Sequence, residues 1–109
     1  MSFAFHGNYC GPGWTAGKYI DAKDATEADF EVPAIDPLDQ ICKYHDLQLW
    51  RAARQPNEYY KRRMEKQADQ VFYNDMMALA SPGMKDEMMA YAVWIAGNSP
   101  KLRTQGMSF

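Results

Sequence analysis

The chain has 109 residues, a formal net charge of −2 at pH 7 and a hydrophobic content of 47%. These values predict one globular domain, spanning residues 1–109, and argue against intrinsic disorder. The weakly acidic balance argues against a nucleic-acid partner. No stretch reaches the roughly 18 apolar residues that a membrane-spanning helix requires.

Residues 1–35 are expected to be irregular, because glycine and proline recur and the apolar residues keep no period. Only residues 21–31 are predicted to hold a short helical turn.

A first helix is predicted over residues 36–54. Asp36 is a suitable N-cap, Pro37 suits the first helical position, and Asp39 adds negative charge at the positive end of the helix dipole. The helix should end before Pro56. The positions expected to face inward at helical spacing are Leu38, Ile41, Cys42, His45, Leu49 and Ala52.

A second helix is predicted over residues 57–80, with Asn57 as its cap, and a third over residues 84–96. The short connection at residues 55–57 predicts that the first two helices pack antiparallel. The fold class is therefore expected to be mainly α. The inward stripe of the second helix is predicted to be Tyr60, Met64, Ala68, Val71, Phe72, Met76 and Leu79.

The only two cysteines belong to two short motifs, Tyr-Cys-Gly-Pro-Gly-Trp at residues 9–14 and Cys-Lys-Tyr-His-Asp at residues 42–46. If the cysteines are joined, their Cα atoms lie about 4.4–6.8 Å apart, which brings the loop carbonyls close to Asp46. Carbonyl and carboxylate oxygens are the ligands that calcium prefers, and glycines let such a loop curl. The two motifs together favour a calcium-assisted hydrolytic site.

His45 falls on the inward stripe and would act there as a general base on water. Such a base is normally oriented by an acceptor at its other ring nitrogen. Asp69 on the second helix is the first candidate for that acceptor. Asp75 is the alternative, because the register between two helices does not follow from the sequence.

These motifs resemble the phospholipase A2 superfamily, whose calcium loop reads Tyr-Cys-Gly-x-Gly and whose active-site helix carries Cys-x-x-His-Asp. The Gly-Pro-Gly form is also similar to the phospholipase domain of parvovirus minor capsid proteins. Ala68-Asp69-x-x-Phe72 resembles the family helix that supplies the aspartate partner. The resemblance covers roughly residues 9–80.

The resemblance implies a disulfide between Cys10 and Cys42 and a bound Ca²⁺. The implied calcium ligands are the backbone carbonyls of Tyr9, Gly11 and Gly13 and the carboxylate of Asp46.

The resemblance further implies catalytic roles. His45 would take a proton from water, which attacks the sn-2 ester of a glycerophospholipid. Calcium and the Gly11 N–H would stabilise the oxyanion, and Asp69 would orient His45. The implied partner is a phospholipid membrane surface, and the aromatic residues suited to it are Phe3, Phe5, Trp14, Tyr19, Trp50 and Trp94.

The chain departs from the family pattern at several points, and one of them is that it has only two cysteines where secreted members have many. Residues 17–35 form an insertion of unknown role. Leu49 stands where the family usually has a tyrosine that bonds the aspartate. The N-terminal helix that many secreted members use at the lipid surface is missing.

Two alternatives remain open. His6, Cys10, Cys42 and His45 have spacings that suit a structural Cys2His2 zinc site. A phospholipase-like binding module without activity is the second alternative.

No secretory signal is visible in residues 1–6, whereas a disulfide requires an oxidising compartment. The sequence therefore predicts an extracellular protein or a delivered effector or toxin domain, with an unknown export route. A toxin made in its own host's cytosol would be kept inactive by low calcium, by reduced cysteines or by a protein inhibitor.

Overall fold

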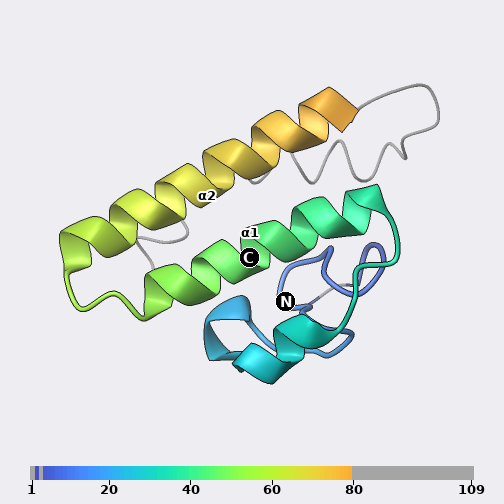
Figure 1. Ribbon diagram of the computed structural model, residues 1–109, viewed down its shortest axis with the longest axis horizontal. Helices are drawn as coiled ribbons and strands as arrows, with labels where there is room; N and C mark the ends of the chain where they lie inside the picture. Colours follow the sequence, from blue (N-terminus) through green and yellow to red (C-terminus); the bar gives the residue numbers. More distant parts are fainter. Residues whose placement is uncertain (1, 3, 80–109) are drawn as a thin grey trace.

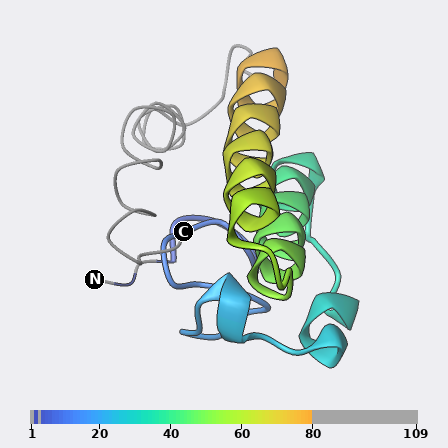
Figure 2. The ribbon, with the colours of Figure 1, turned by 90° about the vertical axis from the view of Figure 1, so that its left-hand side faces the viewer.

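The computed structural model describes residue 2 and residues 4–79 and shows a mainly helical fold (Figure 1). Helices α1 (Pro37–Ala53) and α2 (Glu58–Leu79) lie side by side and antiparallel, as both ribbon views show (Figures 1 and 2). Within the described residues there is no strand that extends beyond an isolated bridge. The third helix predicted over residues 84–96 lies outside the described residues.

Helix α1 begins as predicted from its capping residues. The Asp36 carboxylate accepts the backbone N–H of Asp39 at 2.8 Å, and Pro37 occupies the first turn. The helix ends at Ala53, with Arg54 as its C-cap. Its buried face carries Cys42, His45, Asp46, Leu49 and Ala52, and Asp39 is buried at its first turn.

Helix α2 begins at the predicted cap, because the Asn57 side chain accepts the N–H groups of Tyr59 and Tyr60 at 2.9 and 3.1 Å. Ala68, Phe72 and Met76 form its buried face, as the helical spacing predicted. The prediction that Tyr60 faces inward is wrong, since its side chain is 57% exposed. Tyr60 lies in the first turn of α2, next to the connecting loop, and the described part of the chain leaves it exposed there.

The N-terminal segment packs below α1 and contains two short 3-10 helices, η1 (Ala22–Asp24) and η2 (Glu27–Glu31) (Figure 2). They confirm the helical turn predicted within residues 21–31. The largest core cluster joins this segment to both long helices and consists of Tyr9, Cys10, Ala16, Cys42, Phe72 and Met76. None of the described helices is both long enough and apolar enough to cross a membrane.

Candidate active site

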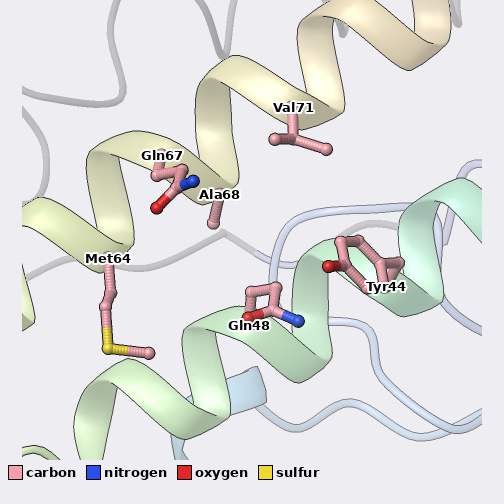
Figure 3. Close-up of a pocket in the computed structure, with 6 residues that line it drawn as sticks. All are labelled: Tyr44, Gln48, Met64, Gln67, Ala68 and Val71. Carbon is pink, nitrogen blue, oxygen red and sulfur yellow. The ribbon is translucent and has the colours of Figure 1, made fainter.

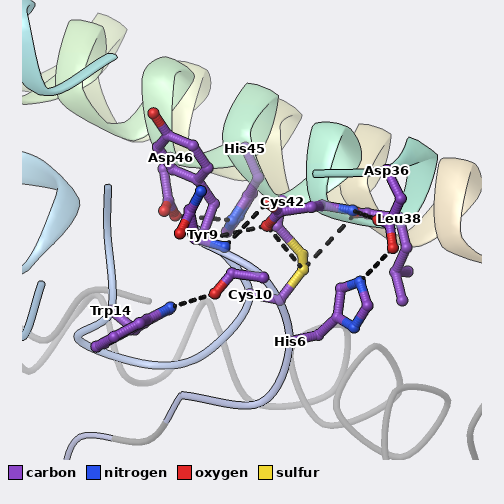
Figure 4. Close-up of a disulfide and its surroundings, with 12 residues drawn as sticks. His6, Tyr9, Cys10, Trp14, Asp36, Leu38, Cys42, His45 and Asp46 are labelled. Atoms are coloured by element: carbon purple, nitrogen blue, oxygen red, sulfur yellow. Dashed lines mark hydrogen bonds and ion pairs between the residues drawn. A yellow bond between two sulfur atoms is a disulfide. The ribbon is translucent and has the colours of Figure 1, made fainter. Parts of the chain in front are cut away.

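The loop at residues 9–14 is tied to α1 by a disulfide between Cys10 and Cys42, whose Cα atoms are 5.1 Å apart (Figure 4). The implied pairing of the cysteines is confirmed. Both cysteines are buried in the largest core cluster. The glycine loop is therefore held against the helix turn that carries His45.

His45 is held on one side by Asp69. Its Nε2 lies 2.7 Å from Asp69 Oδ1, and the side chains of the two residues are 2% and 8% exposed. Phe72 lies one turn further along α2, and its ring centroid is 4.7 Å from that of the imidazole. The structure brings the first candidate to His45, whereas the alternative Asp75 is exposed on α2.

The other ring nitrogen of His45 faces Asp46. His45 Nδ1 lies 4.0 Å from Asp46 Oδ1. The Thr15 hydroxyl donates to Asp46 Oδ2 at 3.2 Å. Asp46 is 3% exposed, so the imidazole is placed between two buried carboxylates and has one nitrogen directed toward each.

The carbonyl groups of the loop divide into those that accept a backbone hydrogen bond and those that do not. The Cys10 carbonyl accepts the N–H groups of Phe5 and His6, and the Gly11 carbonyl accepts the N–H of Trp14 at 3.3 Å. Within the described residues, the carbonyls of Tyr9 and Gly13 accept no backbone hydrogen bond.

The glycines of the loop adopt the backbone region that favours this residue. The φ angles of Gly11 and Gly13 are 147° and 65°. The Gly11 N–H donates to no backbone acceptor in the described part of the chain. Within residue 2 and residues 4–79, one N–H and two carbonyl groups of the loop thus form no backbone hydrogen bond.

The oxygen donors of this region fit the chemistry that calcium requires. Asp46 supplies one buried carboxylate, and the loop supplies the carbonyls of Tyr9 and Gly13, which are hard oxygen ligands. Residues 2 and 4–79 contain no cluster of three or more His, Cys, Asp or Glu side chains that would hold a metal ion. A site made mostly of carbonyls does not need such a cluster, so calcium binding stays a prediction.

Tyr9 is buried and anchors the loop to the insertion. Its hydroxyl lies 3.0 Å from the carbonyl oxygen of Asp29 and 2.5 Å from that of Val32, and its ring stacks on Phe30. Burial, and then the negative charge of Asp46, raise the pKa of Tyr9 to about 12. The segment at residues 17–35 therefore has a structural role that the sequence did not reveal, because it buries the Tyr9 side chain.

The four residues of the alternative zinc site do not come together as ligands. The sulfurs of Cys10 and Cys42 are bonded to each other. His6 Nε2 lies 2.7 Å from Asp36, and His45 Nε2 lies 2.7 Å from Asp69. This geometry does not provide a Cys2His2 set.

Some of the aromatic residues predicted to contact a membrane form contacts within the protein, and others are exposed. The indole N–H of Trp50 donates to the carbonyl of Ala25 at 2.7 Å, and Arg54 covers the ring at 3.9 Å. Tyr19 is 70% exposed and packs against Trp14, the last residue of the loop at residues 9–14. Phe3 and Trp94 lie outside the described residues.

A separate cavity of about 120 Å³ lies between α1 and α2 (Figure 3). None of the predicted site residues lines it. The lining residues are Tyr44, Gln48, Met64, Gln67, Ala68 and Val71.

A scan against protein-family models, and searches of curated proteins and of solved structures, find no match to the chain. The interpretation of the site therefore depends on its geometry and on the motif resemblance.

Proposed function

We propose that the protein is a calcium-dependent phospholipase A2 that hydrolyses the sn-2 ester of glycerophospholipids. The observation that carries this proposal is the placement of His45. Its Nε2 is 2.7 Å from Asp69, its Nδ1 is 4.0 Å from Asp46, and the disulfide ties the loop to the same helix. A buried imidazole with a carboxylate on one nitrogen is the arrangement of a general base.

The chain's own residues suffice for the proton transfers. Asp69 accepts a hydrogen bond from the Nε2–H of His45, so the lone pair on Nδ1 serves as the base. A water molecule at Nδ1 loses its proton as its oxygen attacks the sn-2 ester carbonyl, and Asp69 stabilises the resulting imidazolium. The carbon–oxygen bond to glycerol then breaks, and His45 returns the proton to the leaving alkoxide. The products are a fatty acid and a lysophospholipid.

The loop supplies the second part of the chemistry. The Gly11 N–H is available in the described structure and would donate to the developing oxyanion, where one such donor is typically worth about 3–4 kcal/mol. Bound calcium would polarise the ester carbonyl and offset the negative charge of the transition state. Its ligands would be Asp46 and the carbonyls of Tyr9, Gly11 and Gly13. The carbonyl of Gly11 also accepts a hydrogen bond from Trp14, so calcium would share that oxygen.

The proposed partner is the surface of a phospholipid membrane, reached from an extracellular or otherwise oxidising compartment. Tyr19 and Phe5 expose 70% and 38% of their surfaces on the N-terminal segment that carries the loop. Aromatic rings suit the headgroup level of a bilayer. A delivered effector or toxin domain, controlled by a protein inhibitor in the cell that makes it, is the biological role that fits this proposal.

The test is release of the sn-2 fatty acid from vesicles of phosphatidylcholine and phosphatidylglycerol, with calcium and with a chelator. His45→Gln should lower the rate by about 100- to 10,000-fold. His6→Gln is the matched control, because it changes the other histidine of the chain and should stay within about twofold of wild type. Equal rates for the two variants would sink the proposal.

An inactive phospholipase-like binding module is the second candidate, and burial favours it. His45 is 2% exposed, and Leu49, which replaces the expected tyrosine, packs with Ala22 and Ala68 in an apolar cluster. For this candidate, folded and oxidised protein would bind the same vesicles without releasing any fatty acid.

A further inference from the structure

Asp39 is a buried carboxylate outside the proposed catalytic site, and it holds the loop to α1. Asp39 is 0% exposed, although it lies in the first turn of α1, where carboxylates are usually solvated. Asp39 Oδ2 accepts the N–H of Asn8 at 2.9 Å and that of Ile35 at 3.1 Å, and Oδ1 accepts the N–H of Tyr9 at 2.9 Å. No Lys or Arg of the described chain forms a salt bridge with it.

These hydrogen bonds fix the orientation of two consecutive peptide planes. The N–H and C=O of a trans peptide point in opposite directions, so a plane that is bonded at both edges cannot rotate. In the first plane the Asn8 N–H donates to Asp39, and the Gly7 carbonyl accepts the Trp14 indole N–H at 3.0 Å. In the second plane the Tyr9 N–H donates to Asp39, and the Asn8 carbonyl accepts the Gly17 N–H at 2.9 Å.

The next peptide plane contains the Tyr9 carbonyl. Its N–H, on Cys10, donates to the His6 carbonyl at 3.1 Å, so the Tyr9 carbonyl points away from that bond. The Tyr9 carbonyl, which we propose as a calcium ligand, therefore comes directly after two peptide planes that Asp39 fixes.

The close approach of Asp39 also explains Gly7. A Cβ atom on Gly7 would lie 2.3 Å from Asp39 Cγ, and the φ of Gly7 is +58°. The carboxylate thus occupies the space that any other residue at position 7 would fill.

We propose that Asp39 is a positioning residue for the loop, which fixes the backbone before the Tyr9 carbonyl and so sets the affinity of the loop for calcium. The second half of this inference rests on the proposed function. The hold of Asp39 on residues 8 and 9 does not depend on it.

The test compares Asp39→Asn with Asp36→Asn in the oxidised full chain, with calcium titrated calorimetrically at a temperature where both variants are folded. In Asp39→Asn one acceptor becomes an amide N–H, so at least one loop N–H loses its partner. Calcium affinity should fall by about 10- to 100-fold, as is typical when a residue that supports a metal ligand is lost. Asp36→Asn is the matched control, because Asp36 caps the same helix turn but binds no N–H of residues 7–9. It should leave the affinity within about twofold of wild type.

A milder variant covers the case in which Asp39→Asn fails to fold. Trp14→Phe removes the indole N–H that bonds the Gly7 carbonyl, at the opposite edge of the first plane, and keeps an aromatic ring at the position that packs against Tyr19. It should weaken calcium binding in the same direction by a few-fold. An unchanged affinity in both Asp39→Asn and Trp14→Phe, or an equal loss in Asp36→Asn, would overturn the inference.

Hydrogen exchange at the amides of Asn8 and Tyr9 separates this inference from the proposed function. At least one of the two amides should lose protection in Asp39→Asn, and both should keep it in Asp36→Asn. If wild type binds no calcium, the proposed function and the calcium half of the inference fail together. Hydrogen exchange alone then decides whether Asp39 holds the loop. If both amides stay protected in Asp39→Asn, Asp39 does not hold the loop.

Discussion

The molecule contains two histidine–aspartate pairs with the same separation and different surroundings. In both, Nε2 lies 2.7 Å from a carboxylate oxygen. His45 and Asp69 join the two long helices, and their side chains are 2% and 8% exposed. His6 and Asp36 join the N-terminal segment to the start of α1, and their side chains are 17% and 38% exposed. Distance therefore does not distinguish the two pairs, whereas burial does.

The surroundings of each pair carry the chemical difference. For His45 the second ring nitrogen lies 4.0 Å from Asp46, whose other oxygen accepts a hydrogen bond from the Thr15 hydroxyl. For His6 the aspartate is the N-cap of α1 and already accepts the Asp39 N–H. The second pair attaches the N-terminal segment to α1, whereas the first pair has the burial and the second carboxylate that the proposed proton transfer requires.

The largest effect is expected when the buried pair of His45 and Asp69 is broken. In Asp69→Asn the amide donates to His45 Nε2, so the ring proton moves to Nδ1 and the base is lost. We expect kcat to fall by about 100- to 10,000-fold, as when the orienting aspartate of a hydrolytic triad is changed to asparagine. Asp36→Asn makes the same change in the exposed pair and should alter kcat less than about twofold. Similar losses of kcat in the two variants would remove the distinction between the pairs.

The next effect concerns the disulfide, which connects the segment of His6 to the helix of His45. Replacing both Cys10 and Cys42 by serine should lower the free energy of unfolding by about 3–4 kcal/mol, because the unfolded chain regains the entropy of a closed loop. Urea denaturation of the oxidised wild type, the reduced wild type and the double variant measures this loss. A reduced wild type as stable as the oxidised form would show that the cross-link contributes nothing.

The smallest effect concerns pH and the exposed pair. Burial opposes ionisation of Asp36, but the Asp39 N–H and the His6 side chain outweigh it and hold the Asp36 pKa below its usual value of 3.8. A depressed pKa in the folded state adds stability that is fully present above the unfolded pKa. That stability is lost as the pH falls through the folded pKa.

The check is the urea midpoint between about pH 2 and pH 5. Wild type should lose stability over this range more steeply than Asp36→Asn, which has no carboxyl to protonate at this position. Parallel curves for the two proteins would mean that the exposed pair adds nothing to stability.

The sequence predicted the elements whose signals are local. The Asp36 and Asn57 caps, the end of α1 near Arg54 and the inward position of His45 all follow from spacing and capping chemistry, and the structure has them. The choice of Asp69 over Asp75 needed the register of two helices, which side-chain packing decides. The structure brings Asp69 to His45.

The sequence did not predict the contacts between the irregular segment and α1. Asp39 was interpreted as a charge at a helix dipole, although its main partners lie some 30 residues earlier in the chain. The Thr15 hydroxyl on Asp46 and the burial of Tyr9 by the insertion were missed for the same reason. An irregular backbone has no period, so nothing in the sequence shows which of its N–H groups face a helix.

The most direct test of the central claim uses phosphatidylglycerol that carries different isotope labels on its sn-1 and sn-2 acyl chains. The products formed by oxidised, folded protein are identified by mass spectrometry, with calcium and with chelator, for wild type and His45→Gln. We expect free fatty acid with only the sn-2 label, formed by wild type in the presence of calcium and lost in the other three conditions. Release of both labels, release in chelator, or undiminished release by His45→Gln would contradict it.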